Sequence, residues 1–152
     1  MGTDIYGGIE FRHTYAGTED YDGEPWVTAM DLWPLYDKTD YKAFGLLFGV
    51  RNYAGFPPLA AARGLPADLS SGMRSHLGSW IERGEMDGAS WVSWGELASL
   101  DPATEPEHFV GEPPTAGSVL GPGTHWPHVF AVMKALAGRF GDDGVRLVVA
   151  FD

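Results

Sequence analysis

The sequence predicts an α+β fold, in which a small antiparallel sheet of two N-terminal strands and one C-terminal strand packs with about four helices on one side. Apolar and polar residues alternate in residues 4–15 and 26–32, and residues 145–151 are almost wholly apolar. Several segments between them repeat apolar residues at helical spacing. A chain of 152 residues that is 44% hydrophobic fits one globular domain over residues 1–152.

The two N-terminal strands are predicted from this alternation. Residues 4–15 place apolar residues and glycine at every second position, which is typical of a half-buried strand. Residues 16–25 form an acidic loop with glycine, and residues 26–32 alternate again. We therefore expect an antiparallel hairpin with a long tip.

The first predicted helix covers residues 41–48, where aromatic residues and leucine recur at helical spacing. Thr39 or Asp40 can cap its start, and Gly49 ends it. Residues 51–66 contain tandem prolines and small residues, so we expect a loop there.

The second predicted helix is the clearest in the chain. Ser70 can cap it, and Gly84 can end it in a left-handed conformation. Its apolar stripe consists of Leu69, Met73, Leu77, Trp80 and Ile81.

A third helix is predicted to begin within the stretch D-G-A-S-W-V-S-W-G-E-L, residues 87–97. Ser93 and Glu96 have the spacing of a capping box, and Val92 can pack on Leu97 as a hydrophobic staple. Such a cap is worth about 1 kcal/mol. We interpret the stretch chiefly as a helix start.

The C-terminal third predicts one loop, one helix and one strand. Residues 102–123 hold several prolines and no periodicity, so we expect a long ordered loop or a mobile flap. Pro127 suits the first turn of a helix that continues to residue 140. The apolar run of residues 145–151 predicts an interior strand, between or beside the N-terminal strands.

Composition excludes several classes of function. Without cysteine the chain has no disulfide and no thiolate ligand or nucleophile. No apolar run approaches the roughly 20 residues of a membrane span, and the N-terminus lacks the pattern of a signal peptide, so we expect a cytoplasmic protein. A net charge of −11 disfavours nucleic acid and anionic membranes and favours a basic protein partner.

Five segments resemble a group of small proteins common in bacteriophage and actinobacterial genomes. They are M-G-T-D-I-Y (residues 1–6), T-D-Y-K-A-F-G-L-L-F-G-V-R-N (39–52), A-A-R-G-L-P-A-D-L-S (61–70), D-G-A-S-W-V-S-W-G-E-L (87–97) and V-V-A-F-D (148–152). The group carries no assigned activity to transfer. Thr3, Tyr6 and Ala89 stand where the group has Cys, His and His, so any metal or catalytic site of those residues would be missing here.

One candidate ligand site is an anion-binding cleft around Arg51 and Arg63, with Asn52 and Trp91 in its lining. Arginine binds carboxylates and phosphates through two parallel hydrogen bonds. The competing interpretation is that each arginine fastens a loop by bonding a backbone carbonyl or an acid.

Other polar residues are weaker candidates. His125 and His128 form an H-x-x-H pair, but zinc needs three or four ligands, so we predict no metal and no cofactor. Asp4, Glu10 and Asp152 lie on strands expected to be neighbours, and carboxylates across a sheet can act as an acid–base pair.

Two functions remain open. The first is a non-catalytic acidic module that binds a protein partner, for example as an inhibitor or immunity-type protein of phage or mobile-element biology. Its predicted contact residues are Tyr15, Glu19, Asp20, Tyr21, Asp22, Trp26 and Trp33. The second is a small enzyme or ligand-binding protein with the anion cleft, His76 and the histidine pair as its polar groups and residues 102–123 as its lid. Oligomeric state stays open.

Overall fold

Four antiparallel strands in the order β2-β1-β4-β3 form the sheet at the centre of the molecule, which a computed structural model describes over residues 2–152. The α+β class with a small antiparallel sheet is therefore confirmed. The strands are β1 (Ile5–Arg12), β2 (Trp26–Asp31), β3 (Asp87–Ser93) and β4 (Val145–Phe151). Met1, the first residue of the segment M-G-T-D-I-Y, lies outside the described residues.

The C-terminal strand β4 is an interior strand beside β1, as the apolar run predicted, and its other neighbour is β3. All of its residues are buried, because it has a strand on each side and helices over both faces. Strand β3 was not expected. Its residues Asp87–Ser93 precede the predicted helix start and pair with β4, with an irregular register near Gly88.

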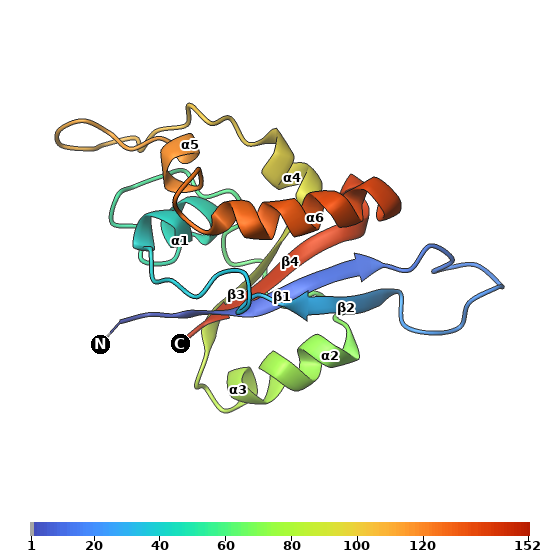
Figure 1. The fold of residues 1–152 in the computed structure, drawn as a ribbon. Coiled ribbons are helices and arrows are strands. Elements are labelled where there is room, and N and C mark those ends of the chain that lie inside the picture. Colours follow the sequence, from blue (N-terminus) through green and yellow to red (C-terminus); the bar gives the residue numbers. More distant parts are fainter. Residues whose placement is uncertain (1) are drawn as a thin grey trace.

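One face of the sheet is covered by helices, as Figure 1 shows. They are α1 (Tyr41–Phe48), α4 (Trp94–Ser99), α5 (Ala116–Val119) and α6 (Trp126–Phe140). The main core lies between them and the sheet, with Phe44, Trp126 and Leu147 among its fully buried side chains. Helix α5 lies within the region expected to be loop.

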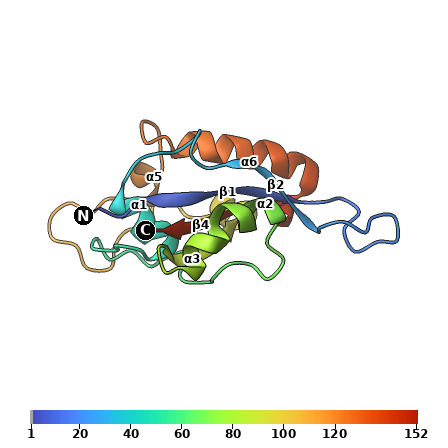
Figure 2. The same ribbon diagram turned by 90° about the horizontal axis from the view of Figure 1, so that it is seen from below.

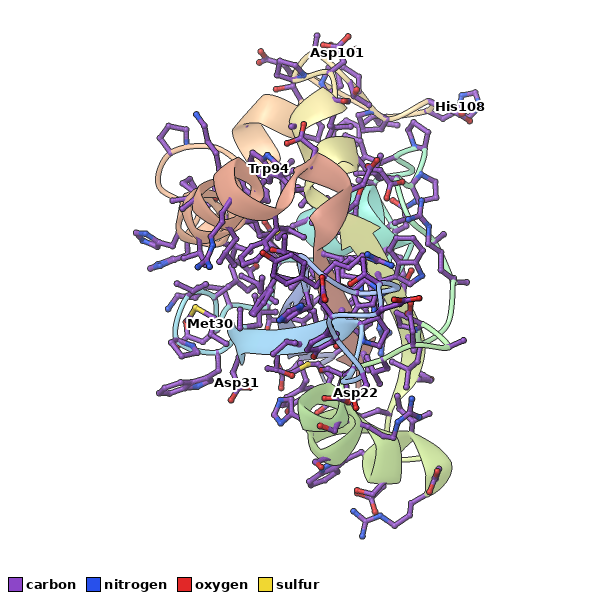
Figure 3. The ribbon with its side chains drawn as sticks, turned by 90° about the vertical axis from the view of Figure 1, so that its right-hand side faces the viewer. Asp22, Met30, Asp31, Trp94, Asp101 and His108 are labelled. Atoms are coloured by element: carbon purple, nitrogen blue, oxygen red, sulfur yellow. The ribbon has the colours of Figure 1, made fainter. Side chains whose placement is uncertain are left out.

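The clearest predicted helix packs on the opposite face, which corrects the expectation of helices on one side (Figures 1 and 3). It is a continuous helical run of α2 (Ser71–Met73), the π-helix η1 (Arg74–Gly78) and α3 (Ser79–Glu82). A second core joins it to β4 through Leu69, Met73, Leu77, Met86, Val148 and Ala150. Because β4 is apolar at every position except Arg146, and all of its residues are buried, both of its faces need a covering layer.

The local signals at the ends of the elements are confirmed. Asp40 caps α1, Ser70 caps α2, and Ser93 with Glu96 forms the capping box of α4. Gly49 is left-handed after α1, and Pro127 lies in the first turn of α6. Within residues 2–152, no helix combines the length and hydropathy needed to cross a membrane.

The two ends of the sheet differ. The loop between β1 and β2 projects at one end, and both chain termini lie close together at the other (Figures 1 and 2). There the backbone N–H of Asp4 donates to Asp152 Oδ1 over 2.8 Å.

Candidate functional site

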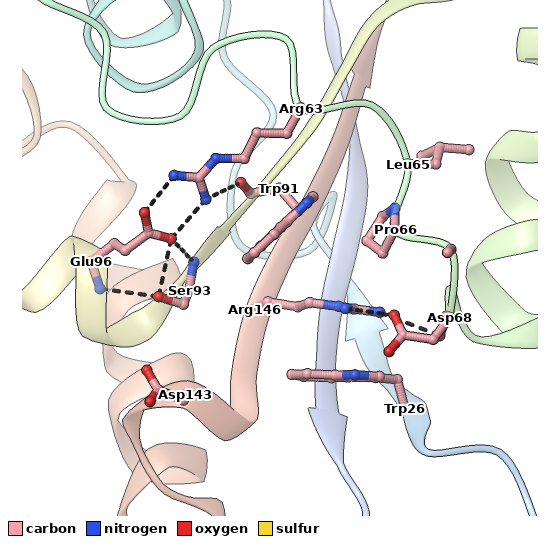
Figure 4. Close-up of a pocket in the computed structure, with 11 residues that line it drawn as sticks. Trp26, Arg63, Leu65, Pro66, Asp68, Trp91, Ser93, Glu96, Asp143 and Arg146 are labelled. Carbon is pink, nitrogen blue, oxygen red and sulfur yellow. Dashed lines mark hydrogen bonds and ion pairs between the residues drawn. The ribbon is translucent and has the colours of Figure 1, made fainter.

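Arg63 lies in an open cleft of about 750 Å³ on the second face of the sheet (Figure 4). It forms a two-pronged ion pair with Glu96, with Nη1 to Oε1 at 2.8 Å, and Nη1 also donates to the Trp91 carbonyl at 3.1 Å. Its guanidinium lies 4.7 Å from the centre of the Trp91 ring. The Arg63 bonds, helped by the Ser93 N–H, lower the pKa of Glu96 to about 2 against the opposing effect of burial.

A buried ion pair forms the floor of this cleft. Arg146 Nε donates to Glu10 Oε1 over 2.7 Å, and Glu10 Oε2 accepts the N–H of Ser70 at the start of α2. Glu10 is 0% exposed. The guanidinium of Arg146 also stacks 3.8 Å from the Trp26 ring and bonds Asp68. Sequence reasoning did not single out Arg146, although Glu10 and Arg146 face each other in the strand register.

The charged groups of this cleft stabilise the structure and are poorly suited to bind an anionic ligand. Both of its arginines already bind carboxylates, and Asp143 adds a further negative charge to the lining. A ligand anion would have to displace Glu96 or Asp68. The contacts instead fasten residues 63–70 to the sheet, which was the competing interpretation for Arg63.

Arg51 and Asn52 lie elsewhere. Arg51 Nε donates to Thr3 Oγ1 at 2.9 Å and Nη1 donates to the Tyr53 hydroxyl at 2.8 Å. The Asn52 side chain donates to the Phe56 carbonyl and accepts its N–H, which closes the loop. In residues 2–152, no pocket that we find is lined by both Arg51 and Arg63.

The predicted histidine pair and the predicted acidic residues also lie apart from Arg51 and Arg63. His125 and His128 have ring centres 5.7 Å apart and border a hollow lined otherwise by Pro and Gly. Across residues 2–152, no group of three His, Cys, Asp or Glu side chains is placed to hold a metal. Asp4 and Asp152 are neighbours, whereas Glu10 lies towards the opposite end of β1.

The predicted partner residues divide between the two ends of β2. Glu19, Asp20 and Asp22 are exposed in the projecting loop, where Tyr15 is 55% exposed and Tyr21 stacks on His13 at 3.6 Å between ring centres. Trp33 follows the other end of β2 and is 75% exposed. The prediction of Trp26 as a partner contact is wrong, because its ring packs against Arg146 and only 7% of the residue is exposed.

A groove with acidic and aromatic walls surrounds Trp33 at the end of the sheet that carries the termini. It consists of two pockets, of about 560 and 350 Å³, which share Tyr6 and His76. We call this surface the acidic groove. The larger pocket is lined by Asp4, Ile5, Tyr6, Gly7, Asp31, Trp33, Tyr36, Asp37, Lys38 and His76, and the smaller by Tyr6, His76, Trp80, Glu85, Met86 and Asp152.

The fold assembles the acidic groove from four separate parts of the chain, which are residues 4–7, 31–38, 76–86 and the C-terminal residue 152. Strand β1 and the C-terminus supply Tyr6 and Asp152, whose hydroxyl and Oδ2 are 3.0 Å apart. Burial and the Asp152 carboxylate raise the pKa of the Tyr6 hydroxyl, so it stays a neutral donor. The π-helix η1 supplies His76, and such wide turns occur often at functional sites.

The chemistry of the acidic groove suits a cation. Its lining contains five carboxylates against one lysine, and two tryptophans that are 75% and 43% exposed. Aromatic faces and carboxylates both attract ammonium and guanidinium groups. Of these residues, sequence reasoning named Trp33 as a partner contact, Asp4 and Asp152 as acids and His76 as a polar group. It did not connect them, because no local pattern links residues so far apart.

Comparison with known proteins adds no assignment: no protein family, curated protein or solved structure matches the chain. The resemblance to the phage and actinobacterial group stays a prediction.

Proposed function

We propose that the protein is a non-catalytic acidic module that binds a basic segment of a partner protein in the acidic groove. The observation that carries the proposal is the lining of this groove, in which carboxylates surround two exposed tryptophans. Aromatic side chains within a polar rim are the usual energetic centre of a protein interface. A cation over a tryptophan face contributes about 0.5–2 kcal/mol, depending on how far it is desolvated.

Charge supports the same partner chemistry at longer range. The net charge of −11 attracts a basic protein and speeds its association, and it repels nucleic acid and anionic membranes. The resemblance to phage and actinobacterial proteins adds the setting that we propose, namely inhibition or neutralisation of a basic protein. Among residues 2–152, Arg51, Arg63 and the pair His125 and His128 lie on separate surfaces, so no contact described there favours the alternative of a small enzyme.

A titration with a basic peptide tests the proposal. We would follow the amide and indole N–H signals of ¹⁵N-labelled protein while adding a peptide in which glycine alternates with arginine and lysine. Saturable shifts at Trp33, Trp80 and their neighbours are expected, with affinity that falls as salt increases. A peptide with glutamine at the basic positions should cause no such shifts.

Two double variants with equal charge loss locate the binding surface. Asp31→Asn with Asp37→Asn, in the acidic groove, should weaken peptide binding about fivefold, because each exposed charge contributes up to about 1 kcal/mol. Asp20→Asn with Asp22→Asn, in the projecting loop, is the matched control and should leave affinity nearly unchanged. Equal weakening by both pairs, or shifts spread over the whole acidic surface, would overturn the proposal.

A further inference from the structure

We infer that the smaller pocket of the acidic groove binds the guanidinium of a partner arginine, and that Arg83 of this chain competes for the same groups. The inference rests on the proposed function and names the side chain that this pocket recognises. The pocket has a volume of about 350 Å³, with Trp80, Met86 and Tyr6 as apolar walls. Glu85 and Asp152 supply its negative charge.

Arg83 is an internal example of the proposed ligand. Its guanidinium carbon lies 5.3 Å from the centre of the Trp80 ring, and its Nε lies 3.2 Å from Glu85 Oε1. The same tryptophan and the same carboxylate line the pocket, whereas Arg83 is not part of the lining. Trp80 and Glu85 are therefore already arranged to accept a stacked guanidinium, and Arg83 contacts them from the rim.

The contact made by Arg83 is weak enough to be replaced. The side chains of Arg83 and Glu85 are 59% and 45% exposed, and an ion pair this exposed is screened by solvent and contributes little. A partner arginine that enters the pocket gains Asp152 in addition, which Arg83 does not contact in an ion pair. The internal pair consequently reduces the affinity for the partner without preventing binding.

Asp152 is held in position to receive a forked donor. Its Oδ1 accepts the Asp4 N–H at 2.8 Å, and its Oδ2 accepts the Tyr6 hydroxyl at 3.0 Å. Each carboxylate oxygen can accept a further hydrogen bond. A guanidinium matches two carboxylate oxygens with parallel N–H groups and stacks on an indole, whereas a lysine ammonium does neither as well. The pocket therefore favours arginine over lysine.

Removing Arg83 provides the sharpest test, since the loss of a competitor should strengthen binding. We would measure the affinity of a fluorescent glycine peptide with one arginine for Arg83→Ala and for Arg74→Ala. Arg74 is exposed on the same helical run and does not stack on Trp80, so its replacement is the control for the lost charge. Arg83→Ala should bind about threefold tighter than Arg74→Ala, which corresponds to less than 1 kcal/mol.

Changes in the peptide and in Trp80 complete the test. Replacing the arginine by lysine should weaken binding, and replacing it by uncharged citrulline should abolish it. Trp80→Ala should weaken arginine binding about fivefold, with folding checked by thermal unfolding. The inference would be overturned if Arg83→Ala and Arg74→Ala bound the peptide with equal affinity, or if the arginine, lysine and citrulline peptides bound equally well. In either case the proposed function would still stand if the double variant Asp31→Asn with Asp37→Asn weakened peptide binding. Absence of binding by every basic peptide overturns both.

Discussion

Glu96 illustrates how one side chain serves both a helix and a loop. Its Oε1 accepts the Ser93 N–H at 3.1 Å, which completes the capping box of α4, and both of its oxygens bind Arg63. The first role is visible in the sequence because it spans three residues. The second joins positions 33 residues apart and depends on the fold.

Acid should weaken the contribution of Glu96. Its pKa is lowered from 4.5 to about 2 in the folded protein, so its stabilising effect is fully present above pH 4.5 and is lost as pH falls towards 2. Glu96→Gln keeps a residue that can cap, and should lose about 1 kcal/mol of unfolding free energy at pH 7. Urea unfolding at pH 7 and pH 3 should show this difference shrinking. An unchanged difference would contradict the prediction, and Glu82→Gln is the exposed control.

Two glycines should respond to alanine in opposite directions. A Cβ at Gly7 would overlap the backbone carbonyl of Val148, so Gly7→Ala should lower the unfolding free energy by about 3 kcal/mol or more. A Cβ at Gly138 in α6 meets nothing within 4 Å, and Gly138→Ala should stabilise by about 0.5–1 kcal/mol. Denaturant unfolding measures both. A mild effect at Gly7 would mean that β1 and β4 are less closely paired than described.

Among the elements, β1 is most changed by its tertiary setting. Alternation predicted a half-buried strand, whereas the helical run of residues 71–82 covers the face that carries Glu10. The carboxylate is consequently buried, and it is stabilised by Arg146 on β4 and by the N–H of Ser70, which caps α2.

The Glu10–Arg146 pair should behave as a coupled unit. Arg146→Met leaves a buried carboxylate without its partner and should cost about 3–5 kcal/mol, and Glu10→Gln should be costly for the converse reason. The double variant should lose clearly less than the sum of the two single losses, because it leaves no unpaired charge. Denaturant unfolding of all four proteins gives the coupling. Additive losses would show that the two groups act independently.

At the scale of the whole molecule, the sheet separates two cores and its ends have different surfaces. The larger core lies under α1, α4, α5 and α6, and the smaller lies under the helical run of residues 71–82. The projecting loop and the acidic groove occupy opposite ends of the sheet. The two acidic surfaces are therefore separate, and the predicted partner contacts divide between them, with Trp33 in the acidic groove and Glu19, Asp20 and Asp22 in the projecting loop.

Hydrogen exchange should follow this organisation. Amides of β4 should exchange most slowly, because this strand has a neighbour on each side and a helical layer on each face. Amides in the projecting loop between β1 and β2 should exchange fastest among the ordered loops. Mass spectrometry or NMR measures both. Comparable rates in β4 and in the loop would contradict a core centred on β4.

Local chemistry in the sequence determined much of this protein. Caps, terminating glycines and the position of Pro127 act within one helical turn, and β4, which is apolar apart from Arg146, requires cover on both faces. These features could be predicted because each depends on residues that are neighbours in the chain. The interior place of β4 followed from the same reasoning.

Tertiary structure alone decided which layer each helix joins and which polar residues meet. An amphipathic helix shows that it has an apolar face but not which surface that face covers, so residues 71–82 could not be assigned to the second face. For the same reason the expected Arg51–Arg63 cleft did not form, while Tyr6, Trp33, His76 and Asp152 came together in the acidic groove. Contacts between residues far apart in the sequence depend on how the layers pack. The spacing of apolar residues shows only which face of each helix or strand is buried, and not what covers it.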